Sequence, residues 1–450
     1  MYKIALNTIS KKISSGLTPL RSNPDFWDSQ DIPWVKTEQL GVKHIYDSNE
    51  KVSKLVFEKT GLKLNPKNTL SIAMYGEGKT RGSVSILKKE MTTNQACCNV
   101  VIDSKKADYE YVYYFLKTQY HQLRNLSSGV RKNLNSNDIK NFEIGLPDSI
   151  SEQNKIAKVL SDLDAKIELN NKINAELEGM AKLLYDYWFV QFDFPISEAY
   201  ASSIGKPELK DKPYKSSGGA MVYNEQLKRE IPEGWDVGTL LDIANFTNGI
   251  ACQKYRPHEG EESLRVIKIR EMGDGFTDKS EFVSKSIPEK VIVFNGDVLF
   301  SWSATLDVKI WTGGIGGLNQ HIFKITSSNY PRTYYYFEIL QYLQHFKMIA
   351  ELRKTTMGHI TQDHLKQSRI VIPPLNLINN LHEQIDPIIN KTVVASEENQ
   401  KLSELRDWLL PMLMNGQVRV GEGLSASGFS GLVDDQDLSM AAEDRGEYGQ

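Results

Sequence analysis

The chain has 450 residues, 40% hydrophobic and 25% charged, a composition typical of soluble globular proteins and a length that exceeds what one core usually serves. No segment is apolar enough to predict a membrane span, so we expect no membrane partner and a cytoplasmic protein. The net charge of −3 is uneven: residues 421–450 hold seven acidic residues against Arg445, a net of −6, which leaves +3 on residues 1–420. That body permits nucleic-acid binding without requiring it, and the acidic Gly/Ser-rich tail is expected to be disordered.

Residues 1–147 are expected to form a first α+β module. Short apolar segments such as 69–73 and 98–102 predict strands between glycine-containing loops. One aromatic helix is expected over 109–123, followed by a loop and a returning strand over 142–146. The order of elements is therefore strands, one helix and a final strand.

Residues 148–193 are predicted to form a long spacer helix. Ser149-Ile150-Ser151-Glu152 has capping-box spacing, and the helix is expected to run to about Val190, on the order of 60 Å. A narrow apolar seam follows it: Leu160, Leu163, Ile167, Leu177 and Leu184. Because this spacing is coiled-coil-like, the helix needs a partner helix.

The chain then repeats itself in a second module, residues 232–374. Val-Lys-Thr-Glu-Gln-Leu-Gly at 35–41 returns as Ile-Lys-Ile-Arg-Glu-Met-Gly at 267–273, and Thr-Asn-Gln-Ala at 93–96 returns as Leu-Asn-Gln-His at 318–321. Repetition at a domain-sized period indicates two similar modules related by a pseudo-twofold internal repeat. Residues 194–231, rich in Lys, Pro, Gly and Ser, are predicted to be a surface linker between the modules.

Residues 375–420 are predicted to form a second long spacer helix with its own seam, at Leu402, Leu405 and Leu409. Asp386-Pro387 could be a cap followed by a first-turn proline, which would leave 376–385 as a separate lead-in turn. Two such seams on one chain predict an antiparallel pair that holds the modules apart at a set distance.

Several motifs, taken in this order, carry a family resemblance. They are Gly-Leu-Thr-Pro at 16–19, Ile-Pro-Trp-Val-Lys at 32–36, Asn-Gln-Ala at 94–96, Asp-Leu-Asp-Ala-Lys-Ile-Glu-Leu-Asn at 162–170, Trp-Phe-Val at 188–190, Phe-Asp at 192–193, Lys-Pro-Tyr-Lys-Ser-Ser-Gly-Gly at 212–219 and Leu-Arg-Asp-Trp-Leu-Leu-Pro-Met-Leu-Met-Asn-Gly-Gln at 405–417. Through them the chain resembles the specificity subunit of type I restriction-modification enzymes. One departure is that the Gly-Trp pair opening module two has no counterpart before Tyr2.

The resemblance implies two target-recognition domains, each reading one part of a bipartite site in double-stranded DNA, with the paired helices setting the gap. It further implies that the subunit does no chemistry and holds no cofactor. Two adenine-methyltransferase subunits would dock on it and, through them, ATP-driven restriction and motor subunits. S-adenosylmethionine, ATP and Mg²⁺ are then expected on these partners.

Two alternatives are weighed against this interpretation. The segment 73–80 (Ala-Met-Tyr-Gly-Glu-Gly-Lys-Thr) satisfies a loose phosphate-loop pattern through Lys79, but the residues after it predict a turn and a strand instead of a helix. Asn-Pro-Asp-Phe at 23–26 is close to the motif of amino-methyltransferases, yet no glycine-rich turn for a methyl donor accompanies it. A self-contained adenine methyltransferase is therefore disfavoured, as is a nucleotide switch.

No metal site is expected. The cysteines, Cys97, Cys98 and Cys252, have no metal-ligand spacing and include an adjacent pair that is a poor disulfide, so reduced thiols are predicted. The histidines are scattered as well.

Basic residues near loops are the candidate DNA contacts, because paired clusters at similar places in two modules suit phosphate and base contacts. They are Lys36, Lys79, Arg81, Arg131 and Lys132 in module one and Lys254, Arg256, Lys268, Arg270 and His359 in module two. The loops 128–134 and 357–361 are the strongest candidates. The aromatic runs at 111–115 and 334–337 are expected to pack against the sheet and not to stack on bases.

Overall fold

The computed structural model describes residues 1–29, 31–76, 78, 80–126, 133–352 and 359–421, so the tail predicted to be disordered lies outside it. By internal contacts the chain divides into two units. Unit 1 comprises residues 1–166 and 402–450, and unit 2 comprises residues 167–401. Each long helix begins in one unit and ends in the other.

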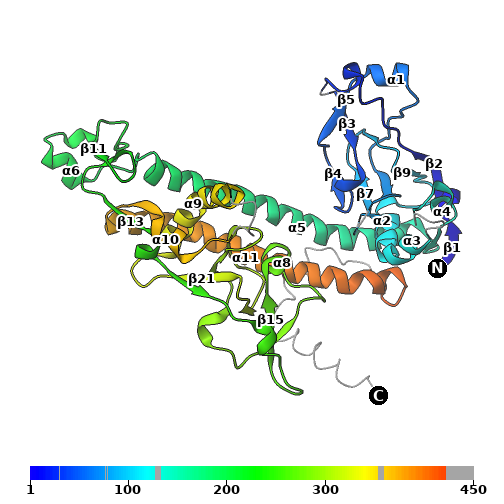
Figure 1. The fold of residues 1–450 in the computed structure, drawn as a ribbon. Coiled ribbons are helices and arrows are strands. Elements are labelled where there is room, and N and C mark those ends of the chain that lie inside the picture. Colours follow the sequence, from blue (N-terminus) through cyan, green and yellow to red (C-terminus); the bar gives the residue numbers. More distant parts are fainter. Residues whose placement is uncertain (30, 77, 79, 127–132, 353–358, 422–450) are drawn as a thin grey trace. The chain divides into compact units, whose positions relative to one another are not determined.

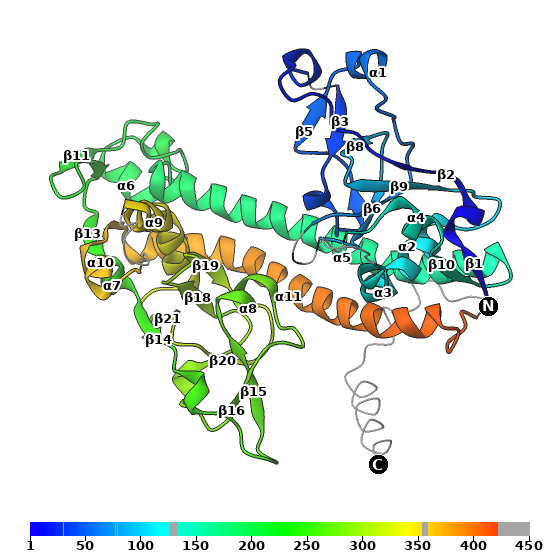
Figure 2. The ribbon, with the colours of Figure 1, turned by 45° about the vertical axis from the view of Figure 1, so that its right-hand side comes forward.

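The described residues of unit 1 form three small sheets, whose strands are labelled in Figures 1 and 2. Strand β1 (Tyr2–Ala5) pairs antiparallel with β10 (Glu143–Leu146). The sheet of five strands runs β2 (Ser10–Ser15), β9 (Cys97–Ile102), β6 (Thr69–Ala73), β7 (Val84–Leu87), β4 (His44–Ile45). The sheet of three runs β5 (Glu50–Val52), β3 (Ile32–Val35), β8 (Thr92–Thr93). The predicted strands at 69–73, 98–102 and 142–146 are thereby confirmed.

Helices lie at two ends of this module. Figure 2 shows α1 (Leu55–Lys59) beside β3 and β5, whereas α2 (Tyr109–Thr118), α3 (Tyr120–Asn125) and α4 (Ser136–Lys140) lie near β1 and β10. The prediction of a single helix over 109–123 is wrong in one respect. Two helices, α2 and α3, occupy this region, because the backbone leaves the helical conformation at Gln119.

Unit 2 has the same plan with added elements. Strand β13 (Asp236–Thr239) pairs antiparallel with β22 (Arg369–Ile372). One sheet of four runs β14 (Asn245–Asn248), β21 (Ile322–Thr326), β18 (Val298–Ser301), β19 (Asp307–Ile310). The other runs β16 (Phe282–Ser284), β15 (Ser263–Ile267), β20 (Gly316–Leu318), β17 (Ile292–Val293). Its helices include α7 (Leu240–Ile243), α8 (Ile269–Asp274), α9 (Arg332–Leu352) and α10 (Gln362–Gln367).

Strand pairing reproduces the sequence repeat. Strands β3 and β8 are parallel with Val35 opposite Thr93, and β15 and β20 are parallel with Ile267 opposite Leu318. The two repeated motifs of each module are therefore side by side in the fold. This agreement confirms two α+β modules of similar topology.

The aromatic runs are part of the cores, as predicted. Tyr111 in α2 and Tyr334 in α9 are buried, and each donates its hydroxyl proton to a carbonyl of the returning strand. The acceptors are Gly145 O in β10 and Val371 O in β22, both at 3.0 Å. The same bond thus ties helix to strand in both modules.

The first long helix is α5 (Ile150–Tyr185), followed by a π-helical turn η4 (Asp186–Val190), as predicted to about Val190. The second is α11 (Leu375–Met414). Within unit 2, Asn170 Nδ2 donates to Asn399 Oδ1 at 2.9 Å and Asn174 Nδ2 to Ser396 Oγ at 3.1 Å. Residue numbers rise on one helix as they fall on the other, so the helices are antiparallel where they pair.

The seam along these helices is mixed. Leu160 and Leu163 are buried, whereas Ile167, Leu177, Leu184, Leu402, Leu405 and Leu409 are half-buried. Asn170, Asn174, Thr392 and Asn399 are buried between them. Polar residues in a helical seam favour one register because each needs its particular partner.

The suggested helix start at Asp386-Pro387 is wrong, because α11 begins at Leu375 and continues through Pro387. Proline removes one helical hydrogen bond, at a cost of about 3 kcal/mol. Ile378, Leu381 and Ile385 in the preceding turns are buried in the core of unit 2, which offsets that loss.

The segment 194–231 is more than the predicted surface linker. It contains α6 (Glu198–Ser203) and the hairpin β11 (Met221–Asn224) and β12 (Arg229–Pro232). The ring of Phe194 stacks on Tyr214 at 4.6 Å and on Trp235 at 5.1 Å. Aromatic burial therefore folds this polar segment onto module two, while residues 216–218 form a turn.

Candidate nucleic-acid interface

The two candidate loops end at the same backbone contact in both modules. Leu134 N donates to Met74 O at 3.1 Å, and Ile360 N donates to Trp302 O at 2.9 Å. Both side chains are buried, and each precedes a capped short helix, α4 or α10. The residues 127–132 and 353–358, which include Arg131 and Lys132, lie outside the described part of the chain.

The repeated Asn-Gln turn is held against a glycine in each module. Leu17 N donates to Thr93 O at 3.0 Å, and Ile250 N donates to Leu318 O at 2.9 Å. A Cβ atom added to Gly16 would lie 2.2 Å from Thr93 O, and one added to Gly249 would lie 2.3 Å from Asn319 O. Only glycine fits these close approaches, so the turn has one defined position on its sheet.

In module two, aromatic and amide side chains gather beside this turn. The ring centroid of Trp302 lies 5.5 Å from that of His359 and 5.7 Å from that of His321. Trp302 Nε1 donates to Asn248 Oδ1 at 3.2 Å, and the side chains of Gln320 and His321 are 3.4 Å apart. We call these five residues the Trp302 cluster. Imidazole and amide groups can both donate and accept hydrogen bonds, which suits contacts with base edges.

Of this cluster, the sequence by itself predicts only His359 as a DNA contact. Trp302 directly follows strand β18, and His321 directly follows the repeated Asn-Gln pair. These positions relative to the repeat are the signal that could have revealed them. Their approach depends on the pairing of β18 with β21, in which Ser301 lies opposite Ile322.

Lys36 and Lys268 occupy corresponding positions and are both ion-paired. Lys36 Nζ lies 2.8 Å from Glu38 and 2.7 Å from Glu50, and these carboxylates raise the pKa of the lysine, Glu38 most. Lys268 Nζ lies 2.5 Å from Glu281. Partners of opposite charge reduce the attraction of either lysine for a phosphate. Both lysines therefore contact carboxylates of their own module.

Arg270 is half exposed and bonded to Glu271, a carboxylate only 1% exposed that also accepts from Ser280 Oγ at 3.0 Å. Lys254 and Arg256 are exposed near the short helix η6 (Cys252–Lys254). Arg81 is half-buried in the turn before β7. Lys79 lies outside the described residues. The exposed candidates of module two, Lys254, Arg256 and Arg270, thus lie near strands β15 and β16.

The structure argues against the nucleotide-binding alternative. A turn at Arg81 and Gly82 leads directly into β7 after Thr80, as predicted. A phosphate loop needs a helix at this point, because the helix N-terminus supplies the amides that bind phosphate.

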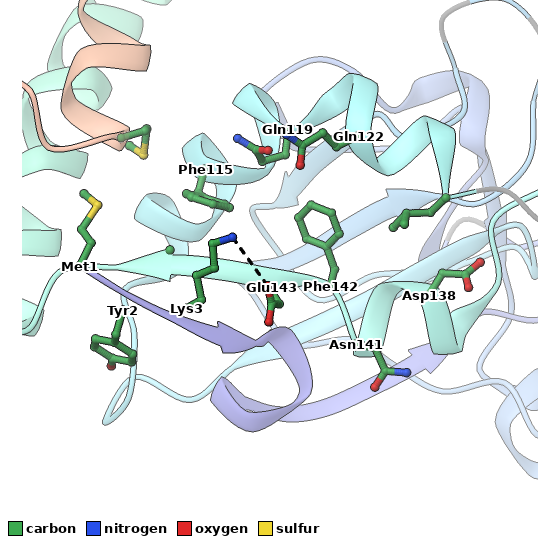
Figure 3. A pocket seen from close by; sticks show the side chains of 13 residues that line it. Met1, Tyr2, Lys3, Phe115, Gln119, Gln122, Asp138, Asn141, Phe142 and Glu143 are labelled. Carbon is green, nitrogen blue, oxygen red and sulfur yellow. Dashed lines mark ion pairs between the residues drawn. The ribbon is translucent and has the colours of Figure 1, made fainter.

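A cavity of about 650 Å³ lies in unit 1 between β1, β10 and the helices α2 and α3 (Figure 3). Phe115, Phe142 and Gln119 line it, with the ion pair Lys3–Glu143 at 3.9 Å on its edge. Apolar, amide and charged side chains therefore share this lining.

The described residues contain no group of His, Cys, Asp and Glu that could hold a metal ion. Cys97, Cys98 and Cys252 are buried free thiols, and burial raises their pKa to about 12, 12 and 11. They are consequently protonated at neutral pH, as expected for structural thiols. Within the same described part of the chain, no helix is both long and apolar enough to cross a bilayer.

Two modules of one topology, each leading into a long helix, define a duplicated two-domain protein. The sequence model of the type I restriction modification DNA specificity domain matches residues 4–179 and again residues 232–404. The chain therefore belongs to the type I restriction-modification DNA specificity family. The resemblance seen in the sequence is confirmed.

Individual relatives agree. The specificity subunit of the type I restriction enzyme MjaIX from Methanocaldococcus jannaschii is 27% identical over 428 residues, covering 91% of this chain and 92% of that protein. The HindI specificity subunit of Haemophilus influenzae is 24% identical over 332 residues, covering 65% and 72%. The crystal structure of the type I S subunit from M. genitalium has a TM-score of 0.56 at 16% identity, over 92% of this chain and 95% of that one, which shows a shared fold. These relatives give no support to a self-contained methyltransferase.

Proposed function

We propose that this chain is the DNA-recognition and scaffolding subunit of a type I restriction-modification complex, in which each module reads one part of a bipartite site. The observation that carries the proposal is the duplicated geometry: the same glycine-held turn and the same loop contact occur once in each module. Two linked readers gain affinity, because binding of the first raises the effective concentration of the second.

The Trp302 cluster supports base reading in module two. Its groups lie beside the Asn319-Gln320 turn, which the fold holds in one position. Lys254, Arg256 and Arg270 are proposed as backbone or base contacts of the same module, with Lys79, Arg81, Arg131 and Lys132 as their counterparts in module one. Phosphate contacts by such cations position the protein, while base contacts specify the sequence.

Lys36 and Lys268 were candidates of the same kind, and their ion pairs favour a different proposal. Each lysine joins the end of one strand to a carboxylate of the neighbouring segment. We propose that Lys36 stabilises the sheet β5-β3-β8 of module one and that Lys268 stabilises the sheet β16-β15-β20-β17 of module two.

Catalysis is proposed to belong to partner subunits, which would bind S-adenosylmethionine, ATP and Mg²⁺ while this chain binds none. Methyl transfer to an adenine requires that the base leave the stack and enter a pocket, which the partner would supply. The assembly is proposed to work in the cytoplasm, with two methyltransferase subunits bound and restriction subunits attached through them.

An exposed apolar stripe on α5 and the following π-helical turn η4 supports the docking of helical partner segments. Its members, with exposed fractions from 38 to 67%, are Leu169, Ile173, Met180 and Leu183 on α5 and Tyr187 on η4. The spacing of 4, 7 and 3 places the four residues of α5 on one face of the helix, and all five lie within unit 2. A stripe that remains exposed along such a length is typical of a protein-binding surface.

The test is to co-express the chain with the methyltransferase of its own system and to map methylated adenines. We expect Trp302→Ala with His359→Ala to relax base preference in one half of the target by about tenfold or more, because one good base contact contributes about 1–3 kcal/mol of discrimination. His345→Ala, an exposed histidine of α9, is the matched control. Equal relaxation in both halves, or none, contradicts the assignment of this cluster to one half-site.

A further inference from the structure

Asp164 of α5 is the centre of a buried polar cluster in unit 1. Arg406 Nη1 of α11 donates to Asp164 Oδ1 at 2.8 Å, and the Tyr114 hydroxyl of α2 donates to Oδ2 at 2.5 Å. Lys43 Nζ, from the segment before β4, lies 2.7 Å from the Tyr114 hydroxyl and 3.4 Å from Oδ2. One carboxylate thus joins module one to both long helices.

Asp386 of α11 has a similar place in unit 2. Arg332 Nη2, at the first residue of α9, donates to Asp386 Oδ1 at 2.6 Å and to Asn390 Oδ1 at 2.7 Å. Arg332 Nη1 donates to Gly296 O, in the turn before β18, at 3.2 Å. This aspartate therefore joins module two to the long helix that follows it.

Stability alone does not account for these clusters. The side chains of Lys43, Asp164 and Arg406 are only 11, 12 and 17% exposed. Removing charges from water is costly, and well-packed apolar residues at such positions are often as stable or more so. A charged cluster fixes the relative orientation of the elements that it joins, since each of its hydrogen bonds forms in one geometry only.

Asp164 is ionised at neutral pH. Burial would raise the pKa of its carboxyl, but hydrogen bonds from Tyr114 and Arg406 and the charge of Lys43 outweigh burial and lower it. The carboxylate therefore accepts bonds from several elements at once, which holds those elements in one arrangement.

We propose that Asp164 and Asp386 are positioning residues that fix the orientation of each module on its long helix, and so limit the separations between half-sites that the protein accepts. The inference rests on the proposed function, because it requires both modules to contact one duplex. Each added base pair displaces the second half-site by about 3.4 Å and rotates it by about 35°. A module held by directional bonds cannot follow that rotation, whereas a loosely held one can.

The test uses the chain assembled with its methyltransferase partner and DNA in which both half-sites are constant while the gap is varied one base pair at a time. Asp164→Asn and Tyr114→Phe both weaken the first cluster, and Tyr114→Phe does so while keeping the buried ring. Asp162→Asn, two residues away on α5, is the matched control, since Asp162 forms an ion pair with exposed Lys158 of the same helix. Asp386→Asn tests the second cluster, with exposed Glu383→Gln as its control.

We expect the preference for the best gap over its neighbours to fall by about tenfold in the cluster variants and not in the controls, with base preferences in both halves unchanged. An unaltered gap preference in folded, methylating variants overturns the inference. Relaxed base preference in one half also overturns it, because the aspartate then supports the reading surface itself. Should Asp164→Asn fail to fold, Tyr114→Phe decides the matter. A wild-type complex that recognises no split target contradicts the proposed function, and this inference with it.

Discussion

Glu338 of α9 makes the stability of unit 2 depend on pH. The carboxyl is partly buried and accepts a hydrogen bond from the Tyr185 hydroxyl at 2.5 Å. Burial raises its pKa from 4.5 to about 7, although the Tyr185 bond and the charge of Arg229 act in the opposite direction. The folded state therefore holds a proton that the unfolded state has released between these two values.

The sign and size of the effect follow from that difference. Below pH 4.5 the carboxyl is protonated in both states, and the folded state bears no penalty. As pH rises to about 7 the penalty grows, and the two pKa values set it at about 3 kcal/mol. Glu338→Gln removes the ionisable group, so we expect it to stabilise unit 2 by about 2–3 kcal/mol at pH 8 and by much less at pH 5.

The assay is urea denaturation of wild type and variant at both pH values, together with hydrogen exchange of the α9 amides. Glu351→Gln, an exposed position on the same helix, controls for the loss of a surface charge. If Glu338→Gln lowers stability equally at pH 5 and pH 8, the carboxyl acts through its bond to Tyr185 in ionised form, and the argument from burial is refuted.

Three further substitutions test the packing. Leu160→Ala, at a fully buried position of α5 in the core of unit 1, is expected to lower the free energy of unfolding by about 2–5 kcal/mol, measured by chemical denaturation. Gly249→Ala should destabilise module two, because the new methyl carbon would overlap Asn319 O, whereas exposed Gly273 has open space and an ordinary φ for the same change; thermal unfolding compares the two. Tyr334→Phe removes the bond to Val371 O and is expected to cost about 1 kcal/mol, and an unchanged unfolding temperature would show that this bond contributes nothing.

Local patterns sufficed for much of the fold. The strand over 69–73 and the long helix after Ile150 are predicted from the spacing of apolar residues within each segment. Such local patterns favour a strand or a helix whatever the rest of the chain does. The duplication of the module could also be predicted from the sequence, because two segments that carry the same motifs in the same order fold alike. The family motifs also depend only on order along the chain, and through them the sequence predicted the family.

The tertiary structure decided what depends on distant residues. Pro387 lies inside a helix because buried residues before it pack on module two, and 194–231 folds because Phe194 meets Tyr214 and Trp235. Likewise, Trp302 approaches His321 and His359 only once β18 pairs with β21. Local sequence sets the conformations that each segment prefers, but burial and pairing of charges are gained only between segments that the fold brings together.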